Sequence, residues 1–150
     1  MKRIKIKKEL CMSCLSCAIA CMASHSEGGK NKPIYELNLS DSELECRNHI
    51  TMDSHNHPTP IFCRHCEEPE CVYTCMSGAM SKNPDTGYVE YDADKCASCY
   101  MCVMNCRYGV LKTDDRSKSK IMKCDMCKDS GIPSCVASCP TGALYMDEEE

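Results

Sequence analysis

Sixteen of the seventeen cysteines in this 150-residue chain fall into four groups of four, called quartets here. The first and third quartets share the spacing C-x2-C-x2-C-x3-C and consist of Cys11, Cys14, Cys17 and Cys21, and of Cys96, Cys99, Cys102 and Cys106. The second (C-x2-C-x4-C-x3-C) and fourth (C-x2-C-x7-C-x3-C) consist of Cys63, Cys66, Cys71 and Cys75, and of Cys124, Cys127, Cys135 and Cys139. Thiolates at such spacings ligate bacterial cubane clusters. The sequence therefore predicts four [4Fe–4S] clusters, whose chemistry is one-electron transfer.

Each cluster is expected to take ligands from two quartets. Three closely spaced cysteines wrap one cube, whereas the fourth lies a helical turn further on and points to another cluster. Twenty residues separate the second and third quartets, which suffices for a hairpin and lets them pair, so the first and fourth must close on each other. The predicted ligand sets, numbered sites 1 to 4, are Cys11, Cys14, Cys17 and Cys139; Cys124, Cys127, Cys135 and Cys21; Cys63, Cys66, Cys71 and Cys106; and Cys96, Cys99, Cys102 and Cys75.

Two other uses of cysteine fit the sequence less well. Structural zinc takes two separated C-x2-C pairs, and three cysteines within seven residues, found twice here, are too crowded for that. A disulfide framework would need an oxidising compartment, but the cysteine count is odd and no signal peptide is visible. We therefore expect a reducing, cytoplasmic and oxygen-poor setting.

The composition leaves little material for an ordinary core. Only 21 residues are Ile, Leu, Val or Phe, and there is no Trp. The clusters are thus expected to supply much of the interior, and the chain without metal to be largely unfolded. The formal charge of −4 would become about −12 once each loaded cluster adds about −2. That charge argues against nucleic acid as a partner and favours a basic surface on a redox protein.

The elements that would hold the thiols are short. Residues 2–10 alternate apolar and basic side chains as a half-buried strand does, and residues 14–24 are small and compatible with a helix. The third and fourth cysteines of each quartet lie four apart, hence on one helical face. A glycine three residues after the second, third and fourth quartets predicts a turn into a short strand. Residues 79–92 predict a hairpin with its turn at 83–87.

Several features lie outside the quartets. The polar insert, residues 22–62, is expected to be a surface excursion with one strand at 34–39, and the acidic tail, residues 147–150, to be disordered. The basic start is interpreted as an edge strand with a solvated face, with a docking patch as the alternative. Met12, Met76, Met101 and Met126 are expected to pack against clusters.

Three further polar side chains leave alternatives open. Cys46 is expected to be a spare thiol because nothing nearby activates it. His55 and His57 form either a metal-binding pair or, the favoured interpretation, a polar loop. His65, between two predicted ligands, either tunes a cluster by donating to sulfur or has no such role.

The chain resembles the four-cluster iron–sulfur subunits of the DMSO-reductase type, and is most similar to their short forms. The resemblance is carried by residues 63–71 (CRHCEEPEC), 123–127 (KCDMC) and 135–143 (CVASCPTGA). It implies an α+β, duplicated bacterial ferredoxin-like fold with the same crossed ligation. Residues 1–150 would form one unit, in which an outer half (1–45 and 112–150) surrounds an inner half (60–111). Compared with the longer members of that family, the chain is expected to lack the C-terminal segments with which they anchor to membrane partners.

The expected function is that of a non-catalytic electron-transfer subunit. The resemblance implies a catalytic partner such as carbon monoxide dehydrogenase, formate dehydrogenase, hydrogenase or aldehyde oxidoreductase, with a second redox subunit or a soluble ferredoxin at the far end. A free, diffusible polyferredoxin and a self-associating, conductive scaffold remain as alternatives. The chain shows no dinucleotide or phosphate-loop pattern and no apolar run of ~18 residues, so neither a nucleotide site nor a membrane span is expected.

Overall fold

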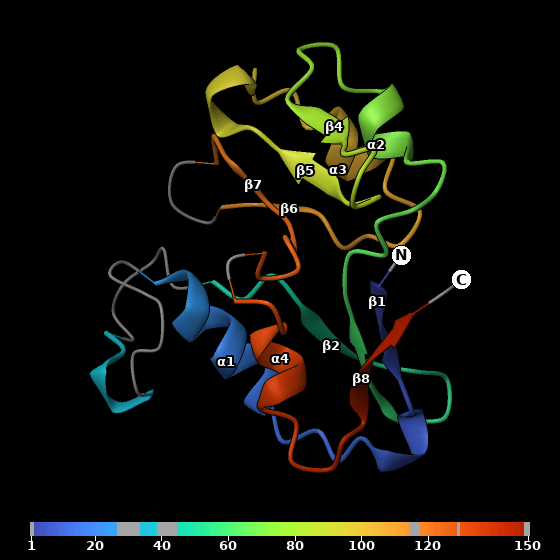
Figure 1. Cartoon of the computed structure of the whole chain (residues 1–150), viewed down its shortest axis with the longest axis vertical. Helices are drawn as coiled ribbons and strands as arrows, with labels where there is room; N and C mark the ends of the chain where they lie inside the picture. Colours follow the sequence, from blue (N-terminus) through green and yellow to red (C-terminus); the bar gives the residue numbers. More distant parts are fainter. Residues whose placement is uncertain (1, 27–33, 39–44, 115–117, 129, 149–150) are drawn as a thin grey trace.

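The computed structural model describes residues 2–26, 34–38, 45–114, 118–128 and 130–148. Helices and strands are short and mixed, and more than half of the described chain lies in turns and loops (Figure 1). The α+β class with few regular elements is therefore confirmed. A chain with so few large apolar residues cannot bury the face of a long helix or a broad sheet, which explains the short elements.

The elements of the described residues follow one another with short connections. The α-helices are α1 (Ser16–His25), α2 (Glu70–Tyr73), α3 (Met101–Met104) and α4 (Ser134–Ala137). The 3-10 helices are η1 (Lys8–Leu10), η2 (Ile34–Glu36) and η3 (Ala93–Lys95). The strands are β1 (Lys2–Ile6), β2 (His49–Met52), β3 (Pro58–Ile61), β4 (Met80–Lys82), β5 (Val89–Tyr91), β6 (Lys112–Thr113), β7 (Ile121–Met122) and β8 (Leu144–Glu148).

The strands pair two by two into four antiparallel sheets, and the first sheet joins the two ends of the chain. β1 pairs with β8, from Lys2 opposite Glu148 to Ile6 opposite Leu144, and α1 lies beside α4. Figure 1 shows these elements together at one end of the molecule, in blue and red. The strand predicted over residues 2–10 is confirmed up to Ile6. It ends there because the chain turns through η1 toward Cys11.

The predicted disorder of the acidic tail is wrong where the structure describes it. Asp147 lies in β8, and its carboxylate meets the Lys5 ammonium at 2.5 Å; residues 149–150 lie outside the described part. Arg3, on the same basic strand, pairs with Glu67 at 3.2 Å. Lys5 of β1 thus attracts the acidic residue Asp147 of β8, and opposite charges across strands stabilise their pairing.

The other end of the molecule is built around the predicted hairpin. β4 pairs with β5, and the turn closes through hydrogen bonds from Gly87 N–H to Asn83 O (2.9 Å) and from Asn83 N–H to Tyr88 O (2.8 Å). The Asn83 side chain also accepts from Asp85 N–H at 2.9 Å, as turn asparagines do. α2 and α3 lie together beside this hairpin, and the β6–β7 pair adjoins it (Figure 1).

Each end of the molecule has its own group of buried side chains, and both groups include cysteines. The first group consists of Cys71, Met80, Val89, Cys102, Val110, Leu111 and Ile121. The second consists of Cys17, Phe62, Cys135 and Leu144, with Ile4, Ile6 and Ile50 packed against it. The boundaries of the two predicted halves stay a prediction.

The segment between the first and second quartets differs from expectation. Residues 34–36 form the 3-10 helix η2 instead of a strand, and Leu39 lies outside the described residues. Two strands, β2 and β3, form an antiparallel hairpin that ends next to buried Phe62. Sequence analysis did not predict this hairpin because β3 contains two prolines, and proline is uncommon in strands. The two prolines are tolerated because alternate N–H groups of an edge strand point to solvent.

Among the described residues, no helix is long and apolar enough to cross a bilayer. The longest, α1, has 10 residues, against roughly 20 needed for a span.

Candidate metal centres

All seventeen cysteines are free thiols, so no disulfide competes with metal ligation. Two of the predicted sites are visible as pockets lined by thiols from distant segments. One pocket gathers Cys11, Cys14, Cys17 and Cys139, the set predicted for site 1. Another gathers Cys75, Cys96, Cys99 and Cys102, the set predicted for site 4. In each pocket three thiols belong to one quartet and one to its partner quartet.

Electrostatics within site 1 and site 4 reflect the same neighbours. Hydrogen bonding from Ser16 lowers the pKa of Cys14, while the neighbouring Cys139 thiolate opposes that shift. Burial raises the pKa of Cys102, and the Cys75 and Cys96 thiolates raise it further. Like charges this close repel unless a cation lies among them, which is the usual arrangement of metal ligands.

At site 2 the predicted borrowed ligand lies beside its expected partners. Burial raises the pKa of the Cys21 thiol to about 12, and the Cys124 and Cys127 thiolates add to this effect. Burial also raises the pKa of Cys135, and Cys124, Cys21 and Cys127 all contribute. The four thiols of site 2 are thus mutual neighbours, although they come from opposite ends of the sequence.

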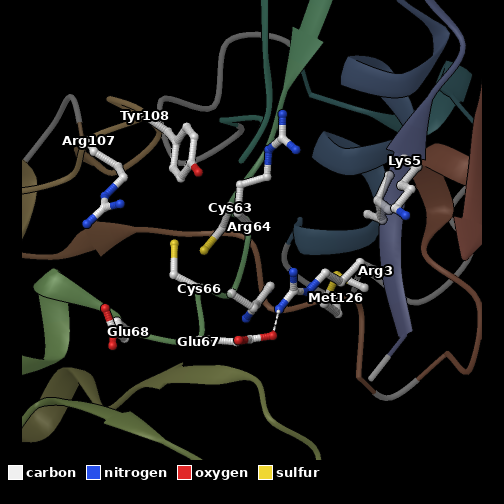
Figure 2. A pocket seen from close by; sticks show the side chains of 12 residues that line it. Arg3, Lys5, Cys63, Arg64, Cys66, Glu67, Glu68, Arg107, Tyr108 and Met126 are labelled. Carbon is white, nitrogen blue, oxygen red and sulfur yellow. Dashed lines mark hydrogen bonds and ion pairs between the residues drawn. The ribbon is translucent and has the colours of Figure 1, made fainter. Parts of the chain in front are cut away.

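Site 3 lies at a pocket whose rim carries several charges. Cys63 and Cys66 line this pocket with Arg3, Glu67 and Arg107, and Figure 2 shows both sulfur atoms among these charged side chains. Burial raises the pKa of Cys71 to about 11, with further contributions from Cys63 and Cys106. The assignment of ligands to all four sites stays a prediction, and these neighbour relations support it.

One backbone feature repeats in every quartet. The second residue after the first cysteine has a left-handed φ each time: 56° at Ser13, 44° at His65, 54° at Ser98 and 61° at Met126. None of these residues is glycine, so each conformation costs of order 1 kcal/mol or more. A strained turn repeated four times indicates one shared constraint, a loop that wraps its cysteines around a common centre. Sequence reasoning missed it because these residue types do not signal a left-handed turn.

The helices carry the third cysteine of each quartet to a buried position. Cys17, Cys71, Cys102 and Cys135 lie in α1, α2, α3 and α4 respectively, and all are buried. The expectation that one helix carries both the third and fourth cysteines holds only for α1. The other three helices end two residues before the fourth cysteine, which lies in the following turn. Three of those helices are single turns, because few apolar residues flank them to extend the buried face.

Glycine turns and backbone donors surround the fourth cysteines. Gly78, Gly109 and Gly142 all have positive φ, and each donates its N–H to the carbonyl of the cysteine three residues earlier. Met80 N–H donates to Cys75 Sγ at 3.3 Å, and Arg47 N–H to Cys21 Sγ at 3.3 Å. Such bonds stabilise a thiolate, and they fit a cluster ligand.

The structure also buries two polar side chains, His65 and Lys123, close to predicted ligands. His65 is 2% exposed; its Nδ1 accepts from Val89 N–H at 2.9 Å, whereas its Nε2 is unsatisfied. Lys123 is 5% exposed. Burial, followed by the charge of Lys123, lowers the pKa of His65 to about 3, so the ring is neutral and Nε2 carries its proton. His65 thus offers a buried hydrogen-bond donor, and Lys123 a buried cation, beside soft thiols. These two groups fit an anionic iron–sulfur cluster better than a site that binds a single metal cation.

A polar network beside site 2 was not foreseen. Asp125 accepts from Arg47 Nη1 at 2.7 Å and from Cys127 N–H at 3.0 Å, and its carboxylate meets His25 Nε2 at 3.1 Å. Burial raises the pKa of Asp125, but the hydrogen bond from His25 and the Arg47 charge outweigh it and hold that pKa well below its usual range. His25, Asp125 and Cys127 could together reach a metal ion. The Arg47 ion pair and the place of Cys127 in the predicted site 2 assign them to the cluster surroundings instead.

The remaining sequence candidates lie as follows. Cys46 donates to Asn48 O at 2.9 Å and lies close enough to Cys21 to raise its pKa, so it is nearer to a quartet than its sequence position indicated. His55 and His57 flank a turn held by Asp53, and within the described residues they join no group of three metal-ligand side chains. Of the four methionines expected to pack against clusters, Met126 is buried, whereas Met76, Met12 and Met101 are 93%, 64% and 39% exposed.

Comparison with known proteins identifies a family, two sequences and a solved structure to which this chain is similar. Residues 55–149 match the family described as 4Fe-4S dicluster domain. Electron transport protein HydN of Escherichia coli (strain K12) is 32% identical over an alignment of 150 positions, which covers 89% of this chain and 81% of that protein. The beta subunit of the NADH-dependent phenylglyoxylate dehydrogenase of Aromatoleum evansii is 40% identical over 83 residues, 55% of this chain but only 18% of that protein. Among solved structures, the active-site complex BamBC of benzoyl coenzyme A reductase with zinc covers 100% of this chain and 80% of its own, with 27% identity and a TM-score of 0.54.

Proposed function

Because the chain belongs to the 4Fe-4S dicluster domain family of iron–sulfur proteins, we propose that it is a non-catalytic subunit relaying electrons between two redox partners through four [4Fe–4S] clusters. The observation that carries this proposal is the gathering of thiols from distant quartets, seen most directly in the two thiol-lined pockets. A bound cluster supplies one-electron transfer. The protein itself supplies ligands, hydrogen bonds to sulfur and a largely buried surrounding.

We assign the ligands in the crossed pattern. Site 1 takes Cys139 from the fourth quartet, and site 2 takes Cys21 from the first. Site 3 takes Cys106 from the third quartet, and site 4 takes Cys75 from the second. The mutual electrostatic effects among these thiols support the assignment.

We further propose that the fold is a duplicated ferredoxin-like unit. The left-handed residue at the same position of all four quartets supports this, as do the matching glycine turns after three of them. The two separate groups of buried side chains fit an outer and an inner half of the chain, and each half would be organised around two of the proposed iron–sulfur sites.

We propose the partners from two observations, namely the kinds of assembly to which similar proteins belong and the exposed apolar side chains of this chain. HydN is named an electron transport protein, and the other two similar proteins belong to oxidoreductase assemblies. Met76 and Met104 are 93% and 78% exposed near site 4, and Met12 is 64% exposed at site 1. These faces suit a catalytic oxidoreductase subunit at one end and a second redox subunit or soluble ferredoxin at the other.

A free electron carrier is the second candidate, and the likeness to HydN over most of both chains favours it. Gentle purification of the native protein from its source separates the two. A stoichiometric catalytic subunit supports the relay, whereas a lone chain that reoxidises in solution supports the free carrier.

The cofactor content is directly measurable. Protein prepared without oxygen should hold about sixteen iron and about sixteen acid-labile sulfide per chain, and its broad absorbance near roughly 400 nm should bleach with dithionite. Stoichiometric zinc in such a preparation, or iron for only two clusters, would contradict the proposal.

A further inference from the structure

Lys123 occupies an unusual position for a lysine. It follows β7 and directly precedes Cys124, the first ligand of site 2, yet it is only 5% exposed. Its ammonium donates to Val89 O and to Cys124 O, the latter at 2.8 Å. Lysine almost never buries its charge unless a partner compensates it.

The protein does not supply that compensation from the residues described. Within them, no aspartate or glutamate lies at ion-pair distance from the Lys123 ammonium. Carbonyl oxygens satisfy two of its hydrogens but cannot cancel a full charge in a low-dielectric interior. An anion that arrives with the cofactor is therefore needed to make this burial favourable.

Two predicted sites converge on this ammonium. On the side of site 2, the ammonium donates to the carbonyl of Cys124 at 2.8 Å. On the side of site 3, it donates to Val89, whose N–H in turn binds His65 in the loop between Cys63 and Cys66. Lys123 thus lies where the two sites approach each other.

The surroundings fix the ammonium in place. Val89, in the hairpin strand β5, binds Lys123 through its carbonyl and His65 through its N–H. His65 comes from the loop between Cys63 and Cys66, and its ring packs against Tyr88 with 5.0 Å between centroids. The cation is therefore held by elements belonging to both sites.

Other nearby charges are weaker candidates for the same role. Arg64 and Arg107 are exposed on the site 3 side, where water and salt screen them. Arg107 is also paired with Glu70, and Arg47 with Asp125. Only Lys123, among the cations described around these two sites, is both buried and without a carboxylate partner.

On the ligand sets proposed above, we propose that Lys123 is the fixed counter-charge of sites 2 and 3 and raises their reduction potentials above those of sites 1 and 4. Reduction adds one electron to a cluster, with no change in its ligands and no proton transfer. The extra negative charge is stabilised by an ammonium held nearby in a medium of low dielectric. Sites 2 and 3 are then reduced before sites 1 and 4, whichever end of the protein receives the electrons.

The test is an anaerobic potentiometric titration with dithionite, followed by EPR, of the wild type and of Lys123→Gln. Removing the charge should favour the oxidised form at least tenfold in two of the four one-electron steps, about 59 mV each, and leave the other two in place. Lys123→Met provides a second neutral variant in case glutamine disturbs packing. Lys123→Arg keeps the charge and should leave all four steps near their wild-type values.

Lys120→Gln is the matched control, because it removes an exposed lysine three residues away and should shift no step. Iron and sulfide are counted first in every protein. A wild type with fewer than four clusters would defeat the proposed function, whatever the titration shows. Four unchanged steps in an iron-replete neutral variant, or equal shifts in Lys123→Arg and Lys123→Gln, would overturn the role of the Lys123 charge alone.

Discussion

Asp125 is the residue at which three distant segments meet. It accepts from Arg47 of the polar insert, faces His25 at the end of α1, and closes onto Cys127 N–H in its own loop. Hydrogen bonds to a charged group are each worth roughly 1.5–3 kcal/mol. The network therefore fixes the insert against the thiols assigned to site 2, where Arg47 N–H also donates to Cys21 Sγ.

Cys21 provides the residue-scale prediction. Cys21→Ser should remove or convert the cluster held by Cys124, Cys127 and Cys135, leaving about twelve of about sixteen iron atoms, because serine is a poorer ligand for iron. The cluster held by Cys11, Cys14 and Cys17 should keep its EPR signal. Iron analysis and EPR of the anaerobic variant measure both.

Cys46→Ser is the matched control, since this thiol lies near Cys21 but has no place in the predicted ligand sets. It should retain all the iron. Loss of the site 1 signal in Cys21→Ser, with site 2 intact, would show that quartets ligate their own clusters and that the crossed scheme is wrong.

The sequence indicated which residues are candidate ligands, and their assignment to sites stays a prediction, but it did not indicate what surrounds them. The quartet spacing alone indicated cluster ligands, because few cofactors need three thiolates within seven residues. It could not indicate that Lys123 is buried or that His25, Arg47 and Asp125 converge. Those contacts depend on how loops far apart in sequence pack together.

At the scale of elements, the structure is organised by turns more than by helices. The same turn follows three quartets: a cysteine carbonyl accepts from a glycine N–H, and a short strand starts within a few residues. Two of the cysteines before these turns, Cys75 and Cys139, line a pocket together with thiols of another quartet. The glycines of these turns were recognisable in the sequence because positive φ is a property that few other residues share.

Gly142 tests the importance of that turn. Its φ is +63°, and a Cβ placed there would meet nothing within 4 Å, so the cost of Gly142→Ala is conformational rather than steric. We expect a loss of about 1 kcal/mol, or a fall of about 2–4 °C in the apparent melting temperature at a fixed scan rate. Gly142→Asn should lose less, because asparagine tolerates this backbone region. Equal stability of the alanine variant would show that the turn relaxes freely.

The elements also show where local sequence fails as a guide. The β4–β5 hairpin was predictable because asparagine, proline and glycine occupy the positions that the turn at residues 83–87 requires. The β2–β3 hairpin gave no such signal, since Pro58 and Pro60 argue against a strand in isolation. It forms where Ile50 of β2 packs against the buried group that contains Phe62, the residue that follows β3. Tertiary packing there overrides local preference.

At the scale of the whole molecule, clusters and chain are expected to be interdependent. Removing iron should abolish the native fold of the entire chain, not of one half. With 21 large aliphatic or Phe residues, burial at ~25 cal/mol per Å2 cannot offset ~1–2 kcal/mol of backbone entropy per residue. Circular dichroism of chelator-treated protein measures this directly. Native-like secondary structure with a sharp thermal transition in iron-free protein would show that side chains alone suffice.

The pairing of β1 with β8 has a consequence for how the protein is made. β1 leaves the ribosome long before its partner β8 is translated, so at roughly 5–20 residues per second it waits on the order of 10 s. During that interval the residues around sites 3 and 4 are already complete, whereas sites 1 and 2 still lack cysteines. Cluster insertion during synthesis should therefore run from the middle of the chain outward, with the early thiols of Cys11–Cys21 exposed longest to oxidation.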